Sequence, residues 1–153
     1  MSKPIRRLKL AGADVKVYSN PAAACEEAAD TFSNFIQVVT RIQSRYVLGL
    51  ATGATPEPVY ARLVEDHIGR GLSFAKVSTY NLDEYYPMGP LDPKSYRSYM
   101  ERHLFSHVNL AANRAHVLDG TIPEAFANEH AAVAHFLKSV GGAASFEKVL
   151  RLC

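Results

Sequence analysis

Short apolar, β-branched runs alternate along the chain with longer stretches in which apolar positions recur every three or four residues. The short runs predict strands buried in a sheet, and the longer stretches predict amphipathic helices. The predicted strands cover residues 15–18, 46–50, 76–81 and 115–118. The predicted helices begin at Asn20-Pro21, near Pro56, after Asp92-Pro93 and at the capping-box pattern of residues 121–124. This alternation is typical of an α/β fold, a three-layer, Rossmann-like arrangement around a mainly parallel sheet.

Glycine and proline mark where the elements should stop. We expect the helix that begins near Pro56 to bury Val59, Leu63 and Ile68 and to end at Gly69 and Gly71. The proline- and glycine-rich residues 87–93 read as a surface loop.

Composition and charge exclude several classes of protein. The 153 residues are 48% hydrophobic and 21% charged, which is typical of a globular protein, and the net charge of +2 argues for neither a nucleic-acid nor a membrane partner. No apolar run reaches the roughly 18 residues of a membrane helix. Cys25 and Cys153 are too few for a disulfide framework. We therefore expect a reduced, cytoplasmic protein, and the sequence leaves the question of a homo-oligomer open.

A buried strand, a short polar loop and a helix meet at residues 49–56. The first-turn amides of a helix have no internal partners and carry partial positive charge, so a phosphate fits this position. Gly53 would let the backbone approach the phosphate, and Thr52 and Thr55 would offer hydroxyls. The alternative interpretation is that Thr55 only caps the helix and Gly53 only forms a turn.

Two adjacent carboxylates, Asp83 and Glu84, follow the strand predicted at residues 76–81. Ligands of open α/β sheets bind beyond the carboxyl ends of the strands. Partial burial and a like-charged neighbour raise the pKa of a carboxyl group, which suits a general base. At most one of the two should face a substrate, and the alternative is an ordinary solvated turn. If the two strands are neighbours, the loop and Asp83 lie at one edge of the sheet, as a small phosphorylated metabolite would require.

Four segments resemble the glucosamine-6-phosphate deaminases in the order and spacing of that family. They are Leu-Gly-Leu-Ala-Thr-Gly-Ala-Thr-Pro at residues 48–56, Ser73-Phe74, Asn-Leu-Asp-Glu-Tyr at residues 81–85 and Ser-Tyr-Arg-Ser-Tyr-Met at residues 95–100. The resemblance extends over about residues 14–142. The related 6-phosphogluconolactonases share the loop but usually carry Asp-Glu-Arg where this chain has Asp83-Glu84-Tyr85.

The resemblance implies the conversion of glucosamine 6-phosphate and water to fructose 6-phosphate and ammonia, with no metal or organic cofactor. Asp83 matches the proton acceptor, which moves a proton from C2 to C1 of the opened sugar. The segment Thr52, Gly53, Ala54 and Thr55 matches the substrate-holding loop, with Ala54 where many members have a second glycine. Glu84 and Tyr85 would support the site.

The chain departs from this family after Gly142. The family continues with a strand and a segment Gly-x-Gly-x-(Asp/Asn)-Gly-His-Ile-(Ala/Gly)-Phe-Asn-Glu-Pro, whose polar residues open the sugar ring, and this sequence holds no such segment. We therefore expect residues 1–142 to be the N-terminal part of such a domain, residues 143–153 to be a divergent tail, and the sheet to be incomplete at the C-terminus. A truncated, fragmentary or frameshifted product would explain this.

Other functions remain open at this stage. One is a 6-phosphogluconolactonase-like hydrolase, and another is a non-catalytic fragment that binds a sugar phosphate. His103 and His107, four apart on a predicted helix, have the spacing of a metal-binding pair, although nothing in that helix completes a ligand set and a packed pair is the simpler interpretation.

Overall fold

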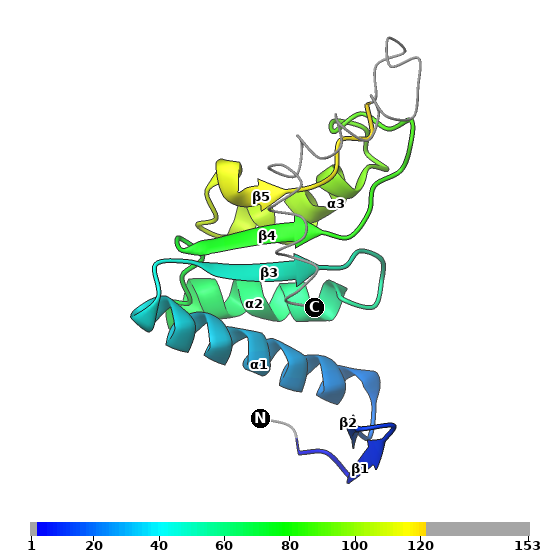
Figure 1. The fold of residues 1–153 in the computed structure, drawn as a ribbon, viewed down its shortest axis with the longest axis vertical. Coiled ribbons are helices and arrows are strands. Elements are labelled where there is room, and N and C mark those ends of the chain that lie inside the picture. The colour runs from blue at the N-terminus through cyan, green and yellow to red at the C-terminus, as the bar shows by residue number, and fades with distance from the viewer. Residues whose placement is uncertain (1–2, 122–153) are drawn as a thin grey trace.

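The computed structural model describes residues 3–121 and contains a small antiparallel hairpin followed by a parallel sheet with helices (Figure 1). The strands are β1 (Arg6–Leu10), β2 (Ala13–Val17), β3 (Tyr46–Leu50), β4 (Val77–Asn81) and β5 (Ala115–His116). The helices are α1 (Pro21–Ile42), α2 (Glu57–Arg70) and α3 (Tyr96–His103), with short 3₁₀ turns η1 (Phe105–His107) and η2 (Ala112–Arg114). No helix among these residues is both long enough and apolar enough to cross a membrane.

The central sheet has the order β3-β4-β5 and is parallel throughout. Leu50 pairs with Asn81 at the carboxyl ends of β3 and β4, and Thr79 pairs with Ala115 of β5. Parallel strands need a crossover connection, and α2 supplies it between β3 and β4. The predicted α/β fold with a parallel sheet flanked by helices is confirmed.

The first strand predicted from the sequence belongs to a separate sheet. β2 pairs with β1, which the sequence analysis missed, and the two form an antiparallel hairpin apart from β3-β4-β5. The turn between them places Ala11 at φ 46° and Gly12 at φ 86°, the left-handed conformation that tight hairpin turns require.

Local sequence explains the start of α1 well. The Asn20 side chain accepts a hydrogen bond from the Ala23 amide at 2.9 Å, and Pro21 occupies the first turn, as predicted. The helix buries Ala29 and Ile36 against the rest of the core.

α2 differs from the prediction in three respects, two at its ends and one in the side chains that it buries. Its N-cap residue is Pro56 with no side-chain cap, so Thr55 does not cap it. Gly69 lies inside the helix, and Gly71 ends it in the left-handed conformation at φ 70°. Ile68 is 77% exposed, because it lies five residues beyond Leu63 and therefore about 140° around the helix from the buried stripe. Val59 and Leu63 are buried as expected.

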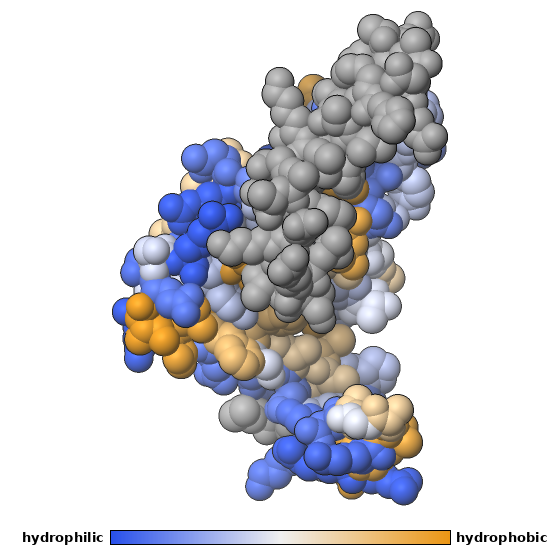
Figure 2. All heavy atoms as spheres, viewed as in Figure 1, coloured by the Kyte–Doolittle hydropathy of each residue, from blue (hydrophilic) through white to orange (hydrophobic). Residues whose placement is uncertain are grey.

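The core lies where α2, α3 and the segment after α2 meet the sheet. Its largest fully buried side chains include Leu63, Leu72, Phe74, Met100 and Leu104. Outside the core, Figure 2 shows apolar side chains gathered over the C-terminal end of α1, where Ile42 is 76% exposed.

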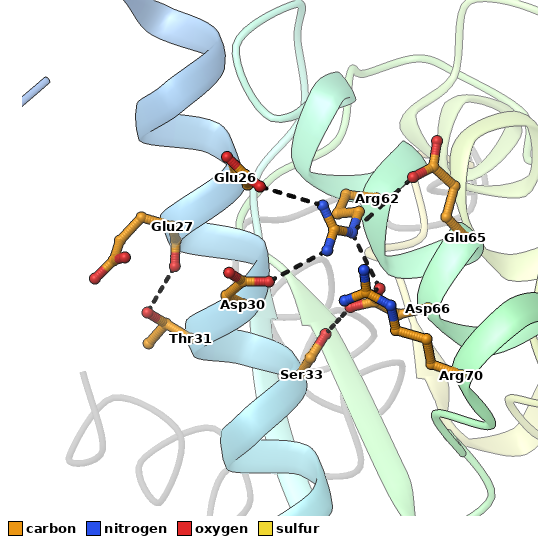
Figure 3. A network of polar contacts seen from close by, with 9 residues as sticks. All are labelled: Glu26, Glu27, Asp30, Thr31, Ser33, Arg62, Glu65, Asp66 and Arg70. Atoms are coloured by element: carbon orange, nitrogen blue, oxygen red, sulfur yellow. Dashed lines mark hydrogen bonds and ion pairs between the residues drawn. The ribbon is translucent and has the colours of Figure 1, made fainter. Parts of the chain in front are cut away.

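A network of charged side chains joins α1 to α2 (Figure 3). Arg62 of α2 reaches Asp66 at 3.0 Å, Asp30 at 3.4 Å and Glu26 at 3.7 Å. Asp66 also accepts a hydrogen bond from the Ser33 hydroxyl of α1 at 2.6 Å. The network therefore fixes α2, the helix into which the residue 51–56 loop leads, against α1.

Two expectations fall on other parts of the chain. The helix predicted from residues 121–124 onward and the divergent tail at residues 143–153 lie outside the described residues, as does the C-terminal completion of the sheet.

Candidate functional site

The two segments that the sequence analysis singled out leave the sheet at the same edge. The register pairs Leu50 with Asn81, and Thr52 and Asp83 each follow that pair by two residues. The carboxyl ends of neighbouring parallel strands point the same way, so the loop and the carboxylate segment begin side by side, as the right-hand ends of β3 and β4 do in Figure 1. The backbone therefore brings the two predicted segments to neighbouring positions.

Side chains from three elements hold the carbonyl groups of the 51–56 loop and the strand residue before it. The Asn81 side-chain amide of β4 donates to the Leu50 carbonyl at 3.2 Å. The Tyr60 hydroxyl of α2 donates to the Ala51 carbonyl. The Tyr99 hydroxyl of α3 donates to the Gly53 carbonyl at 2.6 Å. The loop is thus fixed through its oxygens.

The N–H groups of the same loop have no acceptor among the described residues. Within residues 3–121, no hydrogen bond uses the amides of Thr52, Gly53, Ala54 or Thr55 as donors. The first turn of α2 offers less than the sequence suggested, because Pro56 and Pro58 have no N–H and the amides of Val59 and Tyr60 donate to the Pro56 carbonyl. The available donors therefore lie in the loop more than in the helix.

Gly53 adopts a conformation that favours glycine. Its φ is +97°, and a Cβ built on it would meet nothing within 4 Å. The backbone turn, and not crowding, is what calls for glycine at this position. Ala54 lacks a positive φ, so alanine is compatible with the local backbone there.

Glu84 has a structural task at the beginning of α3. One carboxylate oxygen accepts hydrogen bonds from the amides of Tyr96 at 2.8 Å and Tyr85 at 2.9 Å, and the other accepts from the Arg97 amide at 3.1 Å. The Ser95 side chain completes the cap through the Ser98 amide, so Ser95 caps the helix in place of the predicted Asp92-Pro93. Asp92 instead accepts from the Lys94 amide within the preceding turn.

Asp83 differs from its neighbour. It is exposed, and within the described residues no hydrogen bond or ion pair holds its carboxylate. Residues 3–121 do not supply the partial burial assumed in the sequence argument. Of the two carboxylates, Asp83 is the one left available to a substrate.

Tyr85 lies at the rim beside these groups. The residue is 53% exposed, and the centroid of its ring lies 4.8 Å from that of the Tyr96 ring. A side-chain hydrogen bond with Tyr96 and the electrostatic effect of that residue raise the pKa of Tyr85 above its usual value.

Asn81, Tyr60 and Tyr99 are the residues of this region to which the sequence analysis gave no role. Burial, aided by the negative charge of Glu57, raises the pKa of Tyr99 to about 12, and burial raises the pKa of Tyr60 still further. Both hydroxyls are therefore protonated donors at neutral pH. The sequence offered one indication of the role of Tyr99. It lies among apolar residues of a predicted helix, and the hydroxyl of a buried tyrosine usually finds a hydrogen-bond acceptor.

The histidine pair has other partners. His103 lies 3.9 Å from the Glu57 carboxylate and packs against the Tyr99 ring, and His107 contacts the Arg102 carbonyl at 2.9 Å. Between residues 3 and 121, no group of three or more His, Cys, Asp or Glu side chains has an arrangement that could hold a metal ion.

Comparison with known proteins gives a consistent result. Residues 19–150 match the family described as glucosamine-6-phosphate isomerases/6-phosphogluconolactonase. The chain is 45% identical over 96 residues to glucosamine-6-phosphate deaminase 1 of Giardia intestinalis, covering 63% of this chain and 36% of the relative. It is 39% identical over 127 residues to human glucosamine-6-phosphate deaminase 2, covering 82% of this chain and 46% of the relative. The chain thus spans less than half the length of these curated relatives.

Solved structures show the same partial coverage. A monomeric glucosamine-6-phosphate deaminase matches with a TM-score of 0.67 and 30% identity, over 80% of this chain and 47% of that one. A 6-phosphogluconolactonase of Thermotoga maritima matches with a TM-score of 0.59 over 76% of this chain and 49% of its own. At 15% identity, this second likeness supports the fold alone.

Proposed function

Since the chain belongs to the glucosamine-6-phosphate isomerase/6-phosphogluconolactonase family, we propose that residues 51–56 and Asp83 form part of a site for glucosamine 6-phosphate of the deaminase type. The observation that carries this proposal is the Leu50–Asn81 register, from which a loop with unused amides and an unpaired carboxylate both begin. The overall reaction converts the amino sugar phosphate and water to fructose 6-phosphate and ammonia.

Each group has a chemical task in this proposal. The amides and hydroxyls of Thr52, Gly53, Ala54 and Thr55 hold the substrate through its phosphate. The Asp83 carboxylate accepts the proton from C2 of the open-chain sugar and returns it at C1 through an enediol-like intermediate. Glu84 fixes the start of α3 through the amides of Tyr96 and Arg97, also accepts from the Tyr85 amide, and so steadies the segment that carries Asp83. Tyr85 borders the sugar.

The deaminase reaction is favoured over lactone hydrolysis by the relatives that share sequence. The Giardia and human relatives, at 45% and 39% identity, are both named glucosamine-6-phosphate deaminases. Tyr85 after Asp83-Glu84 points the same way. The lactonase structure resembles this chain in fold but at only 15% identity.

The rate expected of these residues is low. A base can remove the C2 proton only from the open-chain form of the sugar, and neither residues 51–56 nor Asp83 opens the ring in this proposal. From these residues alone we therefore expect binding of glucosamine 6-phosphate and slow exchange of its C2 hydrogen, with little or no release of ammonia.

The test combines three measurements on the full chain. Proton NMR in D₂O follows exchange at C2 of glucosamine 6-phosphate, a coupled assay follows ammonia, and titration follows binding. Asp83→Asn should lower the exchange rate by about 10²-fold or more while keeping the affinity, because a positioned general base contributes about that much. Asp14→Asn, an exposed carboxylate on the hairpin, is the matched control.

The competing functions give different outcomes. Hydrolysis of 6-phosphogluconolactone above the buffer rate, with no exchange at C2 of glucosamine 6-phosphate, would refute the deaminase proposal in favour of the lactonase. Binding of glucosamine 6-phosphate with the same absence of exchange in the wild type and in Asp83→Asn would leave only a non-catalytic binding fragment.

A further inference from the structure

The hydrogen bonds to the 51–56 loop constrain more than the oxygens that accept them. A peptide unit is planar and trans, so its C=O and N–H point in opposite directions. The carbonyl of Ala51 shares a plane with the amide of Thr52, and the carbonyl of Gly53 shares one with the amide of Ala54. A donor that holds one of these carbonyls in place therefore also fixes the N–H of the same peptide unit, which points in the opposite direction.

The Tyr99 hydroxyl is well suited to this task. It contacts the Gly53 carbonyl at 2.6 Å from a side chain that is only 8% exposed, so water competes poorly for the bond. Gly53 is the residue at which the loop turns, with φ +97°, and its peptide unit has no ladder of strand or helix bonds to hold it. Without a donor at this point, the plane of the Gly53–Ala54 peptide could rotate.

The neighbouring peptide units are held in the same manner. The Tyr60 hydroxyl donates to the Ala51 carbonyl, and the Asn81 amide donates to the Leu50 carbonyl at 3.2 Å. Reversing the Asn81 amide would set its Oδ1 against the Leu50 oxygen, so the orientation that donates to Leu50 is the favourable one. The three donors come from α2, α3 and β4, so the loop is tied to three separate elements.

We propose that Tyr99 is a positioning residue, which together with Tyr60 clamps the loop carbonyls so that the amides of Ala54 and Thr52 face a bound phosphate. This proposal rests on the proposed function in one respect, namely that the bound phosphate is part of a sugar phosphate. A carbonyl that accepts a hydrogen bond also makes the N–H of its own peptide a stronger donor. The clamp thus orients the two amides and strengthens them.

Two single substitutions on ¹⁵N-labelled full chain separate the clamp from general packing. Tyr99→Phe removes the hydroxyl and keeps the ring in the core. Tyr46→Phe removes a hydroxyl at the opposite end of β3 and serves as the control. Inorganic phosphate and glucosamine 6-phosphate are each titrated, and amide resonances report both binding and the state of the loop. An unchanged Phe74 amide reports an intact core.

We expect both probes to shift the Ala54 and Thr52 amides of the wild type. Tyr99→Phe should move the Ala54 amide resonance in the absence of ligand and weaken binding of either probe about two- to tenfold, the worth of one hydrogen bond. Tyr60→Phe should act on the Thr52 amide in the same way. Tyr46→Phe should bind like the wild type.

The remaining outcomes discriminate between the clamp and the function. Wild-type affinity in Tyr99→Phe, with the Ala54 resonance displaced, would overturn the clamp and leave the function intact. If only inorganic phosphate binds and Tyr99→Phe weakens it, the clamp stands and the proposed substrate is wrong. If the amides of residues 52–55 respond to neither probe, both proposals fall.

Discussion

Asp66→Asn is the substitution that most directly tests how α2 is held. The Asp66 side chain is 4% exposed and lies at the centre of the contact between α1 and α2 (Figure 3). It accepts from the Ser33 hydroxyl at 2.6 Å and from Arg62 Nε at 3.0 Å, and Arg70 approaches at 3.3 Å. Asparagine keeps the volume but removes the charge and one acceptor.

The expected loss follows from those contacts. A hydrogen bond to a charged group is worth about 1.5–3 kcal/mol and a neutral one about 0.5–1.5 kcal/mol, so each of the two close bonds loses about 1 kcal/mol. The Arg70 side chain is 62% exposed, and its contribution is small because solvent screens the pair. Arg62 keeps Asp30 and Glu26, so no buried charge is left unpaired. The total is about 2 kcal/mol of unfolding free energy.

The difference should also depend on pH. Burial alone would raise the pKa of Asp66, but hydrogen bonds from Ser33 and Arg62 outweigh it and lower the pKa below its usual value of 3.8. A carboxyl group whose pKa is lower in the folded state stabilises the fold above its unfolded pKa, and that contribution disappears as the pH falls through the folded pKa. The gap between wild type and Asp66→Asn should be full at neutral pH and narrow below about pH 4.

Urea unfolding followed by circular dichroism measures this gap, because the chain has no tryptophan for fluorescence. A loss of 2 kcal/mol corresponds to a midpoint shift of about 1 M urea. Asp14→Asn is the control, since its pair with Lys9 at 3.7 Å is about four-fifths exposed on both sides and should contribute less than about 0.5 kcal/mol. If Asp66→Asn matched that control at neutral pH, or if its deficit persisted unchanged into acid, the network would not hold the helices as described.

Two further substitutions test the segments around the site, both by urea unfolding. Glu84→Gln leaves one acceptor oxygen for three backbone amides and should lower the free energy of unfolding by about 1–2 kcal/mol. Glu65→Gln, whose side chain is 73% exposed, is the control and should change the free energy of unfolding little. Equal losses in the two variants would contradict the capping role of Glu84. Gly120→Ala would place a Cβ 2.6 Å from the Met88 carbonyl and against that of Tyr85, so we expect a loss of about 1–3 kcal/mol. Gly69→Ala, inside α2 with nothing within 4 Å, should instead stabilise by about 0.5–1 kcal/mol, and a loss there as large as at Gly120 would refute the steric argument.

The central strands could be predicted from the sequence because their side chains carry the information. Residues 46–50 form an almost continuous apolar run and match β3, and residues 76–81 differ from β4 by one residue. β1 was missed although it has the same burial pattern as β2, and although Leu8 and Leu10 flank Lys9 as Val15 and Val17 flank Lys16. Arg6–Leu10 holds no β-branched residue, so the pattern that predicted the other strands is absent from it. The strand is held by its backbone pairing with β2.

The candidate site was predictable in its position but not in its internal contacts. The order of strand, loop and carboxylate located both segments, and parallel pairing brings them to one edge. The bond from Tyr99 to Gly53 joins residues 46 apart, and no local pattern predicts such a contact. Glu84 could not be distinguished from Asp83 by sequence, because only the position of the α3 amides shows which carboxylate is already occupied.

The common direction of β3 and β4 also has a practical consequence for experiments on this protein. Every parallel strand presents its amino end to the face opposite the site, and the turn between α1 and β3 lies on that face. Ser44 in this turn is exposed and has no hydrogen-bond partner among residues 3–121. A fluorophore or spin label introduced there through cysteine would be separated from residues 51–56 by the length of a strand, and could report on ligand binding without obstructing it.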